Sequence, residues 1–471
     1  MNINQVKNIC CIGAGYVGGP TMTVIANYWH NIKVNVVDIN QERINAWNDK
    51  DLNNLPIYEP GLDILIKKTR GKNLFFSTDV ESSIASADII FLSVNTPTKT
   101  KGFGAGQASD LRWIEISARQ IAKYAKGYTI VVEKSTLPVK TAETIQQILN
   151  AELTSSIYTT ESKSFSVLSN PEFLAEGTAI TDLEKPDRLL IGGDDANAIK
   201  TLEDLYKAWI PHEKILKTNL WSSELSKLTA NAFLAQRISS INSISALCEA
   251  TGADIKEVAR AVGSDRRIGD KFLNSGPGFG GSCFKKDILN LVYLCNYYGL
   301  HEVANYWESV VTLNSWQQHR ISSLIVNKLF RTLSGKRIAI FGFAFKSNTN
   351  DTRESPAVSI CKDLLEEGAN LAIYDPKVNK RQIEVNLNLQ SSRNIANDNI
   401  SQIKKFEAIE DCVEGADAIV ILTEWDEFKI VNWEKISKLM RKPSWIFDAR
   451  GILNQKSAIK AGFKVWSVGK G

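Results

Sequence analysis

The chain has 471 residues, too many for one hydrophobic core, which predicts two or three domains. Its 44% hydrophobic and 23% charged residues are ordinary for a globular protein, and a net charge of +4 without a long basic run argues against nucleic-acid binding. No apolar run approaches the roughly 20 residues of a membrane span. Seven scattered cysteines without CxxC pairing argue against a disulfide framework or a zinc site and favour a reducing, cytoplasmic setting.

The first segment predicts a strand, a glycine turn, a helix and a second strand. Residues 8–13 form a short apolar run that leads into Gly13, Gly15 and Gly18, which make the pattern GxGxxG. A second apolar run, KVNVVD, ends at Asp38, twenty residues after Gly18. Such glycines admit a pyrophosphate to the backbone at a helix N-terminus, and the acid accepts from a ribose 2′-hydroxyl. The context predicts a dinucleotide site and favours NAD over NADP.

Further strand-like runs alternate with helical segments and lie at residues 87–94, 128–135, 165–170 and 188–193. This alternation predicts an α/β fold with a parallel, doubly wound sheet, whose ligands bind beyond the carboxyl ends of the strands. Polar clusters follow three of these strands, at residues 95–98, 133–136 and 170–177. A single polar loop is usually only a loop, but three at one end of a sheet indicate a ligand site.

The middle of the chain predicts mainly helices. Residues 221–262 lack proline and contain one glycine, Gly252, which predicts one long helix or two in line. Glu224, Lys227 and Asn231 would share one face of this helix, although a Glu–Lys pair is often only a solvated surface pair. Residues 301–334 predict another helix. We therefore expect an NAD-binding Rossmann-like domain at 1–215 and a central helical connector at 216–330.

A glycine-rich stretch within this connector, GPGFGGSCFKKD at residues 276–287, contains Cys283. Ser282 can cap a helix that starts near Phe284, so the thiol would lie at a helix N-terminus. The helix macrodipole there favours an anion and lowers a thiol pKa from roughly 8.5 towards neutrality, which makes the cysteine a nucleophile. The alternative is a glycine turn before an ordinary helix with a half-buried structural cysteine.

Residues 331–471 predict a second Rossmann-like α/β half. The runs KRIAIFGF, LAIYDP, GADAIVILTEW and PSWIFDAR are strand-like, and SADIIFLSVNTP in the first half has the same pattern as GADAIVILTEWD in the second. The second half lacks a full GxGxxG, so it is expected to bind a nucleotide without being a second NAD site. Lys346 and Arg450 follow strands and are candidate phosphate contacts, against the alternative of ordinary surface charge.

These segments together resemble the UDP-glucose/GDP-mannose dehydrogenase family, and most closely its eukaryotic-type UDP-glucose 6-dehydrogenases. The resemblance rests on GAGYVGGP, VNTPTKT, EKSTLPV, NPEFLAEGTAI, GFGGSCFKKD and GFAFKSNTNDTRESP, in this order over about residues 8–450. It implies a four-electron oxidation of UDP-glucose to UDP-glucuronate with two NAD. The first oxidation gives an aldehyde that Cys283 attacks, the second gives a thioester, and water releases the product. This agrees with the residues, because a nucleophile must make an aldehyde tetrahedral before it can lose a hydride.

The resemblance also implies roles for individual residues. Lys227 is similar to the lysine that steadies the C6 alkoxide, and Glu172 to the glutamate that serves thioester hydrolysis. Asn231 and Asp287 resemble groups that hold water and the substrate oxygen, and Thr136 completes the catalytic set. The predicted cofactor contacts are Gly13, Gly15, Tyr16, Val17, Gly18, Asp38, Arg43, Val94, Thr96, Ser135, Thr136, Glu176 and Arg353. The predicted substrate contacts are Glu172, Phe173, Leu174, Glu176, Lys227, Asn231, Arg267, Phe272, Phe279, Gly280, Phe284, Phe345, Lys346 and Arg450.

Three alternatives stay open on the sequence. A sister enzyme that acts on GDP-mannose or a UDP-N-acetylhexosamine would share Cys283 and the NAD site. A catalytically silent nucleotide-binding protein would keep binding without forming NADH, although Cys283, Lys227 and Asp287 argue against it. A two-electron dehydrogenase of the 6-phosphogluconate type would form one NADH per sugar. The resemblance also implies a homo-oligomer, either a dimer or a hexamer, and the sequence predicts no metal.

Overall fold

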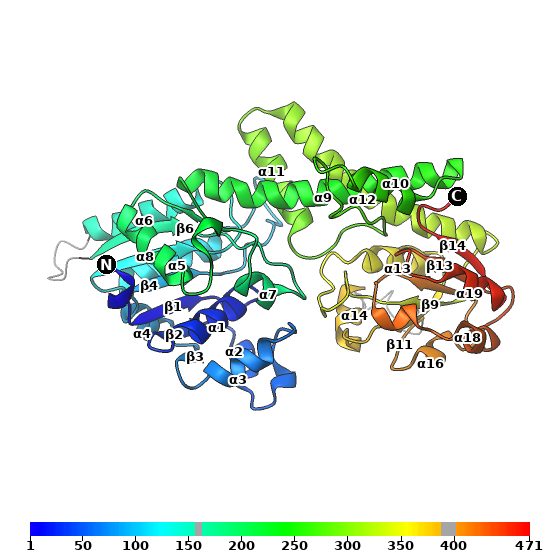
Figure 1. Cartoon of the computed structure of the whole chain (residues 1–471), viewed down its shortest axis with the longest axis horizontal. Helices are drawn as coiled ribbons and strands as arrows, with labels where there is room; N and C mark the ends of the chain where they lie inside the picture. The colour runs from blue at the N-terminus through cyan, green and yellow to red at the C-terminus, as the bar shows by residue number, and fades with distance from the viewer. Residues whose placement is uncertain (156–162, 388–401) are drawn as a thin grey trace. The chain divides into compact units, whose positions relative to one another are not determined.

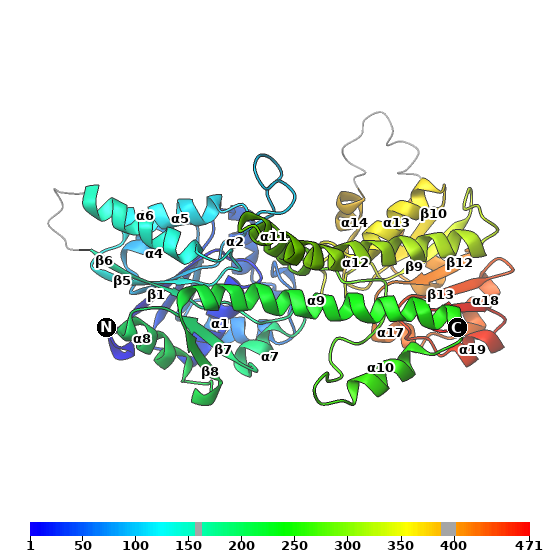
Figure 2. The same ribbon diagram turned by 90° about the horizontal axis from the view of Figure 1, so that it is seen from above.

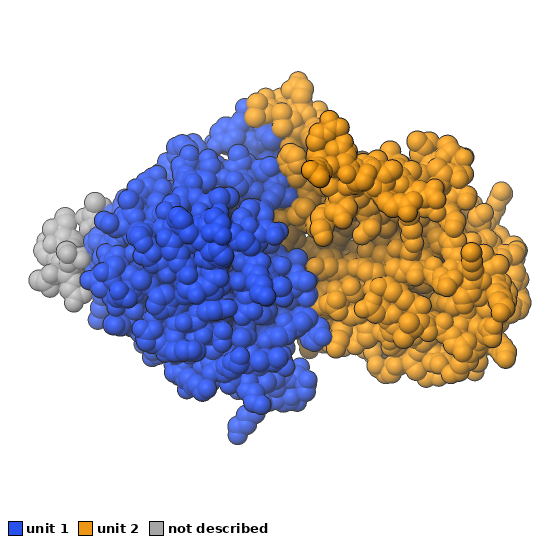
Figure 3. Space-filling view, in the orientation of Figure 1, with its two compact units in different colours: residues 1–230, 289–298 blue, residues 231–288, 299–471 orange. Residues whose placement is uncertain are grey.

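The computed structural model describes residues 1–155, 163–387 and 402–471 of the chain. The chain forms two compact units, which Figure 3 shows in different colours. Unit 1 contains residues 1–230 and 289–298, and unit 2 contains residues 231–288 and 299–471. Two helices contribute residues to both units, α9 (Leu220–Thr251) and α11 (Phe284–Tyr297). The division into three domains expected from the sequence, at 1–215, 216–330 and 331–471, remains a prediction.

Unit 1 is built on an eight-stranded sheet with the order β3-β2-β1-β4-β5-β6-β7-β8 (Figure 1). The strands are β1 (Asn8–Ile12), β2 (Lys33–Val37), β3 (Leu74–Ser77), β4 (Ile89–Leu92), β5 (Tyr128–Glu133), β6 (Ser164–Ser169), β7 (Leu189–Gly192) and β8 (Ile215–Thr218). The first six strands have the order 3-2-1-4-5-6 of a dinucleotide-binding fold, so the predicted doubly wound α/β architecture is confirmed.

Helices cover both faces of this sheet (Figure 2). One face carries α1 (Gly18–Tyr28), α3 (Leu62–Thr69), α7 (Ala179–Glu184) and α8 (Ala196–Tyr206), and the other carries α4 (Val80–Ala85), α5 (Arg112–Tyr124) and α6 (Thr141–Ser155). The remaining elements are α2 (Gln41–Asn48) and the 3-10 turns η1 (Ile3–Gln5), η2 (Leu52–Asn54) and η3 (His212–Lys214).

The continuous apolar runs of the sequence are explained by this double cover. In β1, Ile9 and Cys11 belong to the core on the α1 face, whereas Cys10 and Ile12 belong to the core on the α5 face. Successive strand residues point to opposite faces, and both faces are buried, so the four positions from Ile9 to Ile12 are all apolar.

Unit 2 contains a six-stranded parallel sheet with the order β11-β10-β9-β12-β13-β14. Its strands are β9 (Arg337–Phe341), β10 (Asn370–Tyr374), β11 (Ile403–Phe406), β12 (Ala418–Ile421), β13 (Trp445–Asp448) and β14 (Lys464–Ser467). Its helices are α10 (Ile255–Gly263), α12 (His301–Lys328), α13 (Pro356–Glu366), α14 (Lys380–Asn386), α16 (Ile409–Val413), α17 (Asp426–Lys429), α18 (Trp433–Leu439) and α19 (Gln455–Lys460). The strand order repeats that of unit 1, which confirms the predicted second Rossmann-like half.

One expectation needs correction. The run at 188–193 forms β7 as expected, but β7 pairs with β6 antiparallel, so the sheet of unit 1 is mixed. The connection from β6 to β7 contains only the short helix α7 and reverses the chain direction. For the stretch 221–262 the sequence left open one long helix or two, and the structure has two, because Gly252 takes a left-handed conformation with φ of 84° and ends the regular helix before α10. Within the described ranges, every helix is too short or too polar to cross a membrane.

Candidate active site

The glycine turn of unit 1 has the geometry that a dinucleotide needs. Gly13 has φ of 109°, and a Cβ there would lie 2.3 Å from the carbonyl oxygen of Ser93. A Cβ on Gly18 would lie 2.0 Å from the carbonyl oxygen of Gly13, so helix α1 packs against the turn only because Gly18 lacks one. Gly15, in contrast, faces open space with no atom within 4 Å of its Cβ position. The turn thus leaves an open backbone cradle at the start of α1, which fits a pyrophosphate.

Asp38 follows β2 directly and is 8% exposed. Its Oδ2 accepts a hydrogen bond of 3.0 Å from the amide of Ala14 inside the glycine turn, and the amide of Asn40 donates to Oδ1 at 2.9 Å. Arg43 pairs with Oδ2 at 2.9 Å. The structure therefore brings Asp38 and Arg43 together beside the turn, as the prediction of a ribose-binding acid requires. Tyr16 and Val17 lie between Gly15 and the first residue of α1.

The predicted cofactor residues at the ends of β4 and β5 are tied to one another. The hydroxyl of Ser135 donates to the carbonyl of Val94 at 2.8 Å, and the hydroxyl of Thr96 donates to the carbonyl of Thr136 at 3.1 Å. These bonds join two neighbouring parallel strands where both end. The polar clusters predicted from the sequence therefore meet at the carboxyl edge of the sheet, where ligands of such folds bind.

Glu172 and Lys227 form a buried ion pair in unit 1. Lys227 Nζ lies 3.4 Å from Glu172 Oε1, and their side chains are 5% and 6% exposed. The hydroxyl of Thr136 donates to the same oxygen at 3.2 Å, and Lys227 Nζ lies 5.4 Å from the centre of the Phe173 ring. Four residues predicted for catalysis or substrate binding thus come together, although they belong to three segments that are far apart in the sequence. A buried charge is costly unless an opposite charge compensates it, and Lys227 and Glu172 compensate each other in this way.

The loop that carries Leu174 and Glu176 is held by a residue that the sequence reasoning missed. Glu59 is 4% exposed, and its carboxylate accepts from the amides of Gly177 at 2.7 Å and Ala179 at 3.1 Å. A carboxylate at the N-terminus of a short helix satisfies its free amides. The available signal was weak, because an acid before Pro60 and Gly61 looks like an ordinary turn residue.

Glu224 is not the solvated surface partner that one interpretation gave it. It is 3% exposed, and its carboxylate accepts from the amides of Lys140 at 2.7 Å and Ala142 at 2.8 Å, at the start of α6. Burial raises the pKa of Glu224, and burial together with Glu224 raises that of Glu133. Glu224 therefore caps a helix, while Lys227 on the same helix pairs with Glu172.

In unit 2, Cys283 directly precedes the first residue of α11, and its carbonyl accepts the amide of Asp287 at 2.9 Å. The prediction of a cysteine at a helix N-terminus is confirmed. The capping position belongs to Cys283 itself and not to Ser282, whose hydroxyl lies 3.5 Å from the thiol. Cys283 is partly exposed, whereas the other six cysteines are buried. Exposure at a helix N-terminus is the environment of a reactive thiol.

Asp287 and Asn231, both predicted to act with Cys283, are hydrogen-bonded to each other. The amide nitrogen of Asn231 donates to Asp287 Oδ2 at 2.6 Å, and the two residues are 6% and 1% exposed, respectively. Lys286 Nζ lies 3.6 Å from Asp287 Oδ1. Asp287 is one turn after Cys283 in α11, so the predicted nucleophile and two of its predicted partners belong to one region of unit 2.

The glycine loop before Cys283 packs tightly against other parts of unit 2. A Cβ on Gly280 would lie 2.5 Å from the carbonyl oxygen of Glu354 and 2.9 Å from Cβ of Phe345, and one on Gly281 would lie 3.1 Å from the Phe345 ring. The rings of Phe279 and Phe284 meet edge to face at 5.8 Å, and those of Phe272 and Phe284 at 6.5 Å. The predicted Phe272, Phe284 and Phe345 thus pack around the part of the loop that contains the predicted Phe279 and Gly280.

Two side chains of α12 fix this loop, and the sequence reasoning did not identify them. Asn314 accepts from the amide of Phe279 at 2.8 Å and donates to its carbonyl at 3.1 Å, while Gln317 donates to the carbonyl of Gly276 at 2.8 Å. Asn314 is 6% exposed and Gln317 0%. Two buried amides three residues apart in a helix were the available signal, since they share one face.

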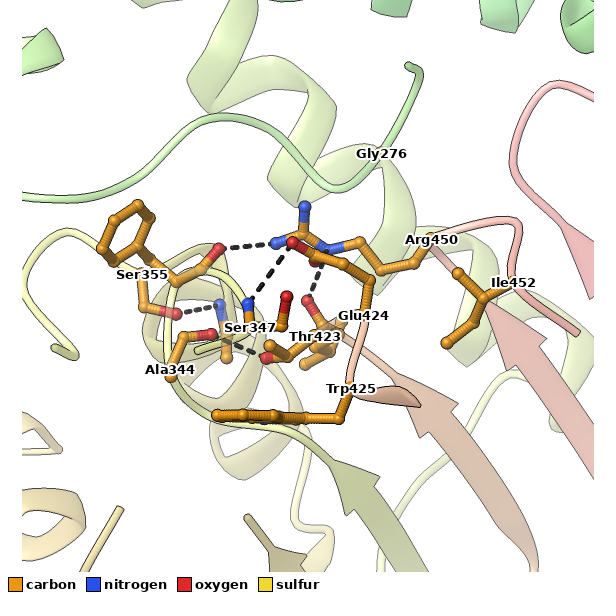
Figure 4. A network of polar contacts seen from close by, with 12 residues as sticks. Gly276, Ala344, Ser347, Ser355, Thr423, Glu424, Trp425, Arg450 and Ile452 are labelled. Atoms are coloured by element: carbon orange, nitrogen blue, oxygen red, sulfur yellow. Dashed lines mark hydrogen bonds and ion pairs between the residues drawn. The ribbon is translucent and has the colours of Figure 1, made fainter. Parts of the chain in front are cut away.

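Arg450 is held by a network of acceptors in unit 2 (Figure 4). Its Nε donates to the carbonyl of Leu422 and its Nη2 to that of Phe345, both at 2.7 Å, and Glu424 Oε2 lies 3.1 Å from Nε. Its Nη1 lies 3.7 Å from the Cβ position of Gly276. Glu424 was not predicted as a site residue. The guanidinium is thus oriented before any ligand binds, with Nη1 turned toward the glycine loop.

The remaining predicted residues of unit 2 are Lys346, Arg353 and Arg267, whose side chains contact groups outside the Arg450 network. Lys346 Nζ lies 5.4 Å from the centre of the Phe345 ring. Arg353 pairs with Asp351 at 2.6 Å and is 48% exposed, although the carbonyl of Arg353 accepts the amide of Gly281 at 2.9 Å. Arg267 is 89% exposed and pairs with Asp265. Within the described ranges, no three histidine, cysteine or acidic side chains gather to hold a metal ion.

Three family models match the chain in order. The NAD binding domain of the UDP-glucose/GDP-mannose dehydrogenase family matches residues 7–210, its central domain residues 221–316, and its UDP binding domain residues 339–455. The matched segments contain the glycine turn, the cysteine loop and the Arg450 network, in that order.

Individual relatives agree with these models over nearly the whole chain. The chain is 55% identical to UDP-glucose 6-dehydrogenase of Gallus gallus, over 99% of this chain and 94% of the relative. It is 54% identical to UDP-glucose 6-dehydrogenase 5 of Oryza sativa subsp. japonica, over 98% and 97%. A solved UDP-glucose dehydrogenase from the archaeon Pyrobaculum islandicum has a TM-score of 0.82 at 28% identity, covering 99% of this chain and 98% of its own. With its two Rossmann-like sheets and its cysteine at the start of α11, the chain belongs to the UDP-glucose/GDP-mannose dehydrogenase family.

Proposed function

We propose that the chain is an NAD-dependent UDP-glucose 6-dehydrogenase that oxidises UDP-glucose to UDP-glucuronate through a thioester on Cys283. The relatives named above support the substrate, because they are UDP-glucose 6-dehydrogenases at up to 55% identity. The observation that carries the mechanism is the place of Cys283, the one partly exposed cysteine of seven, at the N-terminus of α11. A thiol in that position is an effective nucleophile toward an aldehyde.

The residues of the glycine turn hold the cofactor. Gly13, Gly15 and Gly18 leave the backbone open to the pyrophosphate, and Asp38 accepts from the ribose. Bound NAD supplies a hydride acceptor for each of the two oxidations. Arg43, Tyr16, Val17, Val94, Thr96, Ser135, Thr136, Glu176 and Arg353 complete the proposed cofactor contacts.

We assign a separate role in the reaction to each of the proposed catalytic residues. Lys227 stabilises the negative charge that develops on the C6 oxygen when its proton leaves. The sulfur of Cys283 then adds to the carbonyl carbon of the aldehyde, and Asn231 and Asp287 hold the resulting oxygen and the water. Once the thioester has formed, Glu172 takes a proton from water, the water oxygen bonds to the carbonyl carbon, and the carbon–sulfur bond breaks to restore the thiolate.

Substrate contacts are proposed for both parts of the nucleotide sugar. Lys346 and Arg450 are cations suited to the diphosphate, and Arg450 is already oriented by its acceptors. The remaining proposed contacts line the sugar and nucleotide, and they are Phe173, Leu174, Glu176, Arg267, Phe272, Phe279, Gly280, Phe284 and Phe345. Overall, one UDP-glucose, two NAD and one water give UDP-glucuronate, two NADH and three protons.

The first test is the amount of NADH formed per UDP-glucose at limiting sugar and excess NAD. We expect two NADH per sugar, together with UDP-glucuronate in the product. We expect Cys283→Ser to form no thioester and to lose sustained turnover, because a serine hydroxyl is a far weaker nucleophile at neutral pH. One NADH per sugar, or unchanged turnover in Cys283→Ser, would contradict the proposal.

A second candidate is a sister enzyme that oxidises another nucleotide sugar. A solved UDP-D-ManNAc dehydrogenase from Pyrococcus horikoshii has a TM-score of 0.78 at 26% identity, covering 98% of this chain and 99% of its own. A panel of UDP-glucose, UDP-N-acetylhexosamines and GDP-mannose separates the two. We expect kcat/KM for UDP-glucose to exceed the others at least tenfold, and a preference for an N-acetylated sugar would favour the sister activity.

We also propose that the chain works in a reducing compartment such as the cytoplasm and associates with copies of itself. Six of the seven cysteines are buried and form no disulfide, which suits a reducing setting. Large apolar side chains remain exposed along α9, among them Trp221, Phe233 and Leu247 at 49%, 55% and 58%. Light scattering after size exclusion measures the oligomer, and we expect Leu247→Arg to reduce its size. A wild-type monomer at micromolar concentration would contradict self-association.

A further inference from the structure

Lys134 is a buried lysine at the carboxyl end of β5 for which the reaction described above has no role. It is 1% exposed, and its ammonium donates to Asn170 Oδ1 at 3.0 Å. Its Nζ also lies 5.8 Å from the centre of the Tyr206 ring. A buried ammonium is costly unless charges or hydrogen bonds compensate it, so its surroundings indicate what it serves.

Asn170 connects Lys134 to the loop that carries Glu172. Asn170 is fully buried, its Oδ1 accepts from Lys134 and from the hydroxyl of Tyr206 at 2.7 Å, and its Nδ2 donates to the carbonyl of Leu190 at 2.7 Å. Glu172 is only two residues later. Lys134 therefore helps to fix the start of the loop from which the Glu172 side chain extends.

Lys134 and Glu172 also line the same cavity, which has a volume of about 90 Å³. The carboxylate of Glu172 uses Oε1 for Lys227 and Thr136, and Oε2 has no hydrogen-bond partner within the described part of the chain. A polar cavity of this size has room for several water molecules. The surroundings thus contain a buried carboxylate with one oxygen uncommitted and a lysine at the same cavity.

The positive charge of Lys134 bears on the charge of Glu172. Glu172 is buried, and the ammonium groups of Lys134 and Lys227 are the positive charges near its carboxylate. Burial lowers the pKa of Lys134 to about 8, although the charge of Glu172 acts in the opposite direction, so Lys134 remains mainly charged at neutral pH. The other titratable or charged groups that face Lys134, Glu172 or their cavity are Cys11, Asp182, Lys185, Asp187, Arg188 and Tyr206.

We propose that Lys134 is a positioning residue for thioester hydrolysis, which keeps Glu172 ionised and its loop in place so that Glu172 can take the proton of the attacking water. The proposal rests on the function proposed above. Only an ionised Glu172 can accept that proton while the water oxygen bonds to the carbonyl carbon and the sulfur of Cys283 leaves. Lys134 itself touches neither the substrate nor the reacting atoms.

Three substitutions separate the charge of Lys134 from its hydrogen bond. Lys134→Met removes both, Lys134→Gln keeps a donor for Asn170 without the charge, and Lys134→Arg keeps both. Lys185→Met is the matched control, because Lys185 lines the same cavity but is solvent-exposed. Each variant is mixed rapidly with UDP-glucose and excess NAD and quenched in acid. NADH per active site and the mass of the acylated enzyme are then measured from pH 6 to 9.

In Lys134→Met and Lys134→Gln we expect the first two NADH per active site to form at the wild-type rate, followed by accumulation of the acylated enzyme. We expect kcat near pH 7 to fall about tenfold or more, and the acid limb of its pH profile to move up by about one pH unit. Lys134→Arg restores the wild-type profile, and Lys185→Met matches wild type. KM for UDP-glucose does not rise, because the defect follows substrate binding.

Two results would overturn the proposal. The first is wild-type hydrolysis and an unmoved pH profile in Lys134→Met. The second is a defect in Lys134→Met that Lys134→Gln removes, which would leave the charge without a role. These outcomes are distinct from failure of the proposed function, which would appear in the wild-type enzyme as the absence of two NADH per sugar or of any acylated enzyme.

Discussion

We expect the substitution Gly280→Ala, which adds one methyl group, to lower kcat much more than it lowers NAD affinity. An alanine Cβ there would lie 2.5 Å from the carbonyl oxygen of Glu354, 2.9 Å from Cβ of Phe345 and 3.0 Å from Cδ of Pro356. Favourable contacts need about 3.5 Å, so the cysteine loop must shift by about 1 Å. Two of these neighbours are backbone or ring atoms, which cannot rotate away. We expect Gly280→Ala to cost about 1–3 kcal/mol of stability through overpacking.

The same displacement should lower kcat far more than it lowers stability. A shift of about 1 Å in a reacting group reduces rates by about 100-fold, and Gly280 is three residues before Cys283. Gly276→Ala is the matched control, because its Cβ would meet its nearest atom at an ordinary 3.6 Å. The measurements are urea unfolding, kcat, the rate of Cys283 alkylation by iodoacetamide, and NAD affinity. NAD affinity should fall far less than kcat, because most of the proposed cofactor contacts belong to unit 1.

Either of two results would contradict a role of this loop in positioning Cys283. If Gly280→Ala and Gly276→Ala have the same kcat and the same unfolding midpoint, the loop accommodates the methyl group and its close packing does not position Cys283. A loss of NAD affinity equal to the loss of kcat would also contradict it, because the change would then be a general loss of structure.

Two further predictions concern charged residues of unit 1. Asp38→Ala removes the carboxylate that pairs with Arg43 at 2.9 Å, so the NADP-to-NAD ratio of kcat/KM should rise about tenfold or more; an unchanged ratio would mean that Asp38 does not face the ribose. Burial alone would raise the pKa of Glu203, but its ion pairs with Lys207 and Lys217, both at 2.9 Å, outweigh it and lower that pKa to about 2. The stability lost in Glu203→Gln should therefore be full above about pH 4.3 and should shrink as the pH falls toward 2; urea unfolding at several pH values measures it, and a loss that is constant from pH 6 to 3 would exclude the ion pairs as its source.

Local patterns in the sequence were sufficient to predict the elements and their order. The apolar runs that become β1 and β9 are buried on both faces, and a continuous apolar run is typical of that situation. Cys283 was predicted at a helix N-terminus because the glycines before it and the spaced apolar residues after it are local signals. The direction of β7 was not predictable, because a strand of four residues looks the same in either orientation.

The supporting polar residues could not be predicted for a related reason. Glu59, Glu224 and Asn314 are buried by segments far away in the sequence, and each is bonded to backbone amides of those segments. Nothing in their immediate neighbours distinguishes them from surface residues. The roles assigned to the site residues remain predictions, since the structure establishes their positions and contacts only.

The second Rossmann-like sheet provides an internal comparison for the first. Gly342 follows β9 with φ of 90°, as Gly13 follows β1, and Asp375 follows β10, as Asp38 follows β2. Asp375, however, is 2% exposed and accepts from four backbone amides and from the indole of Trp425. The helix α13 begins fourteen residues after Gly342, whereas α1 begins five residues after Gly13.

The two sheets thus have an aspartate at the same topological position, Asp38 in unit 1 and Asp375 in unit 2, but its contacts differ. In unit 1 the carboxylate of Asp38 pairs with the partly exposed Arg43, whereas in unit 2 the carboxylate of Asp375 accepts five hydrogen bonds from the protein itself. An acid-to-amide replacement should therefore alter coenzyme choice at Asp38 and folding at Asp375. Strand order alone does not make a dinucleotide site: a short turn and an acid with spare hydrogen-bonding capacity are also needed, and this chain contains one half with both and one half with neither.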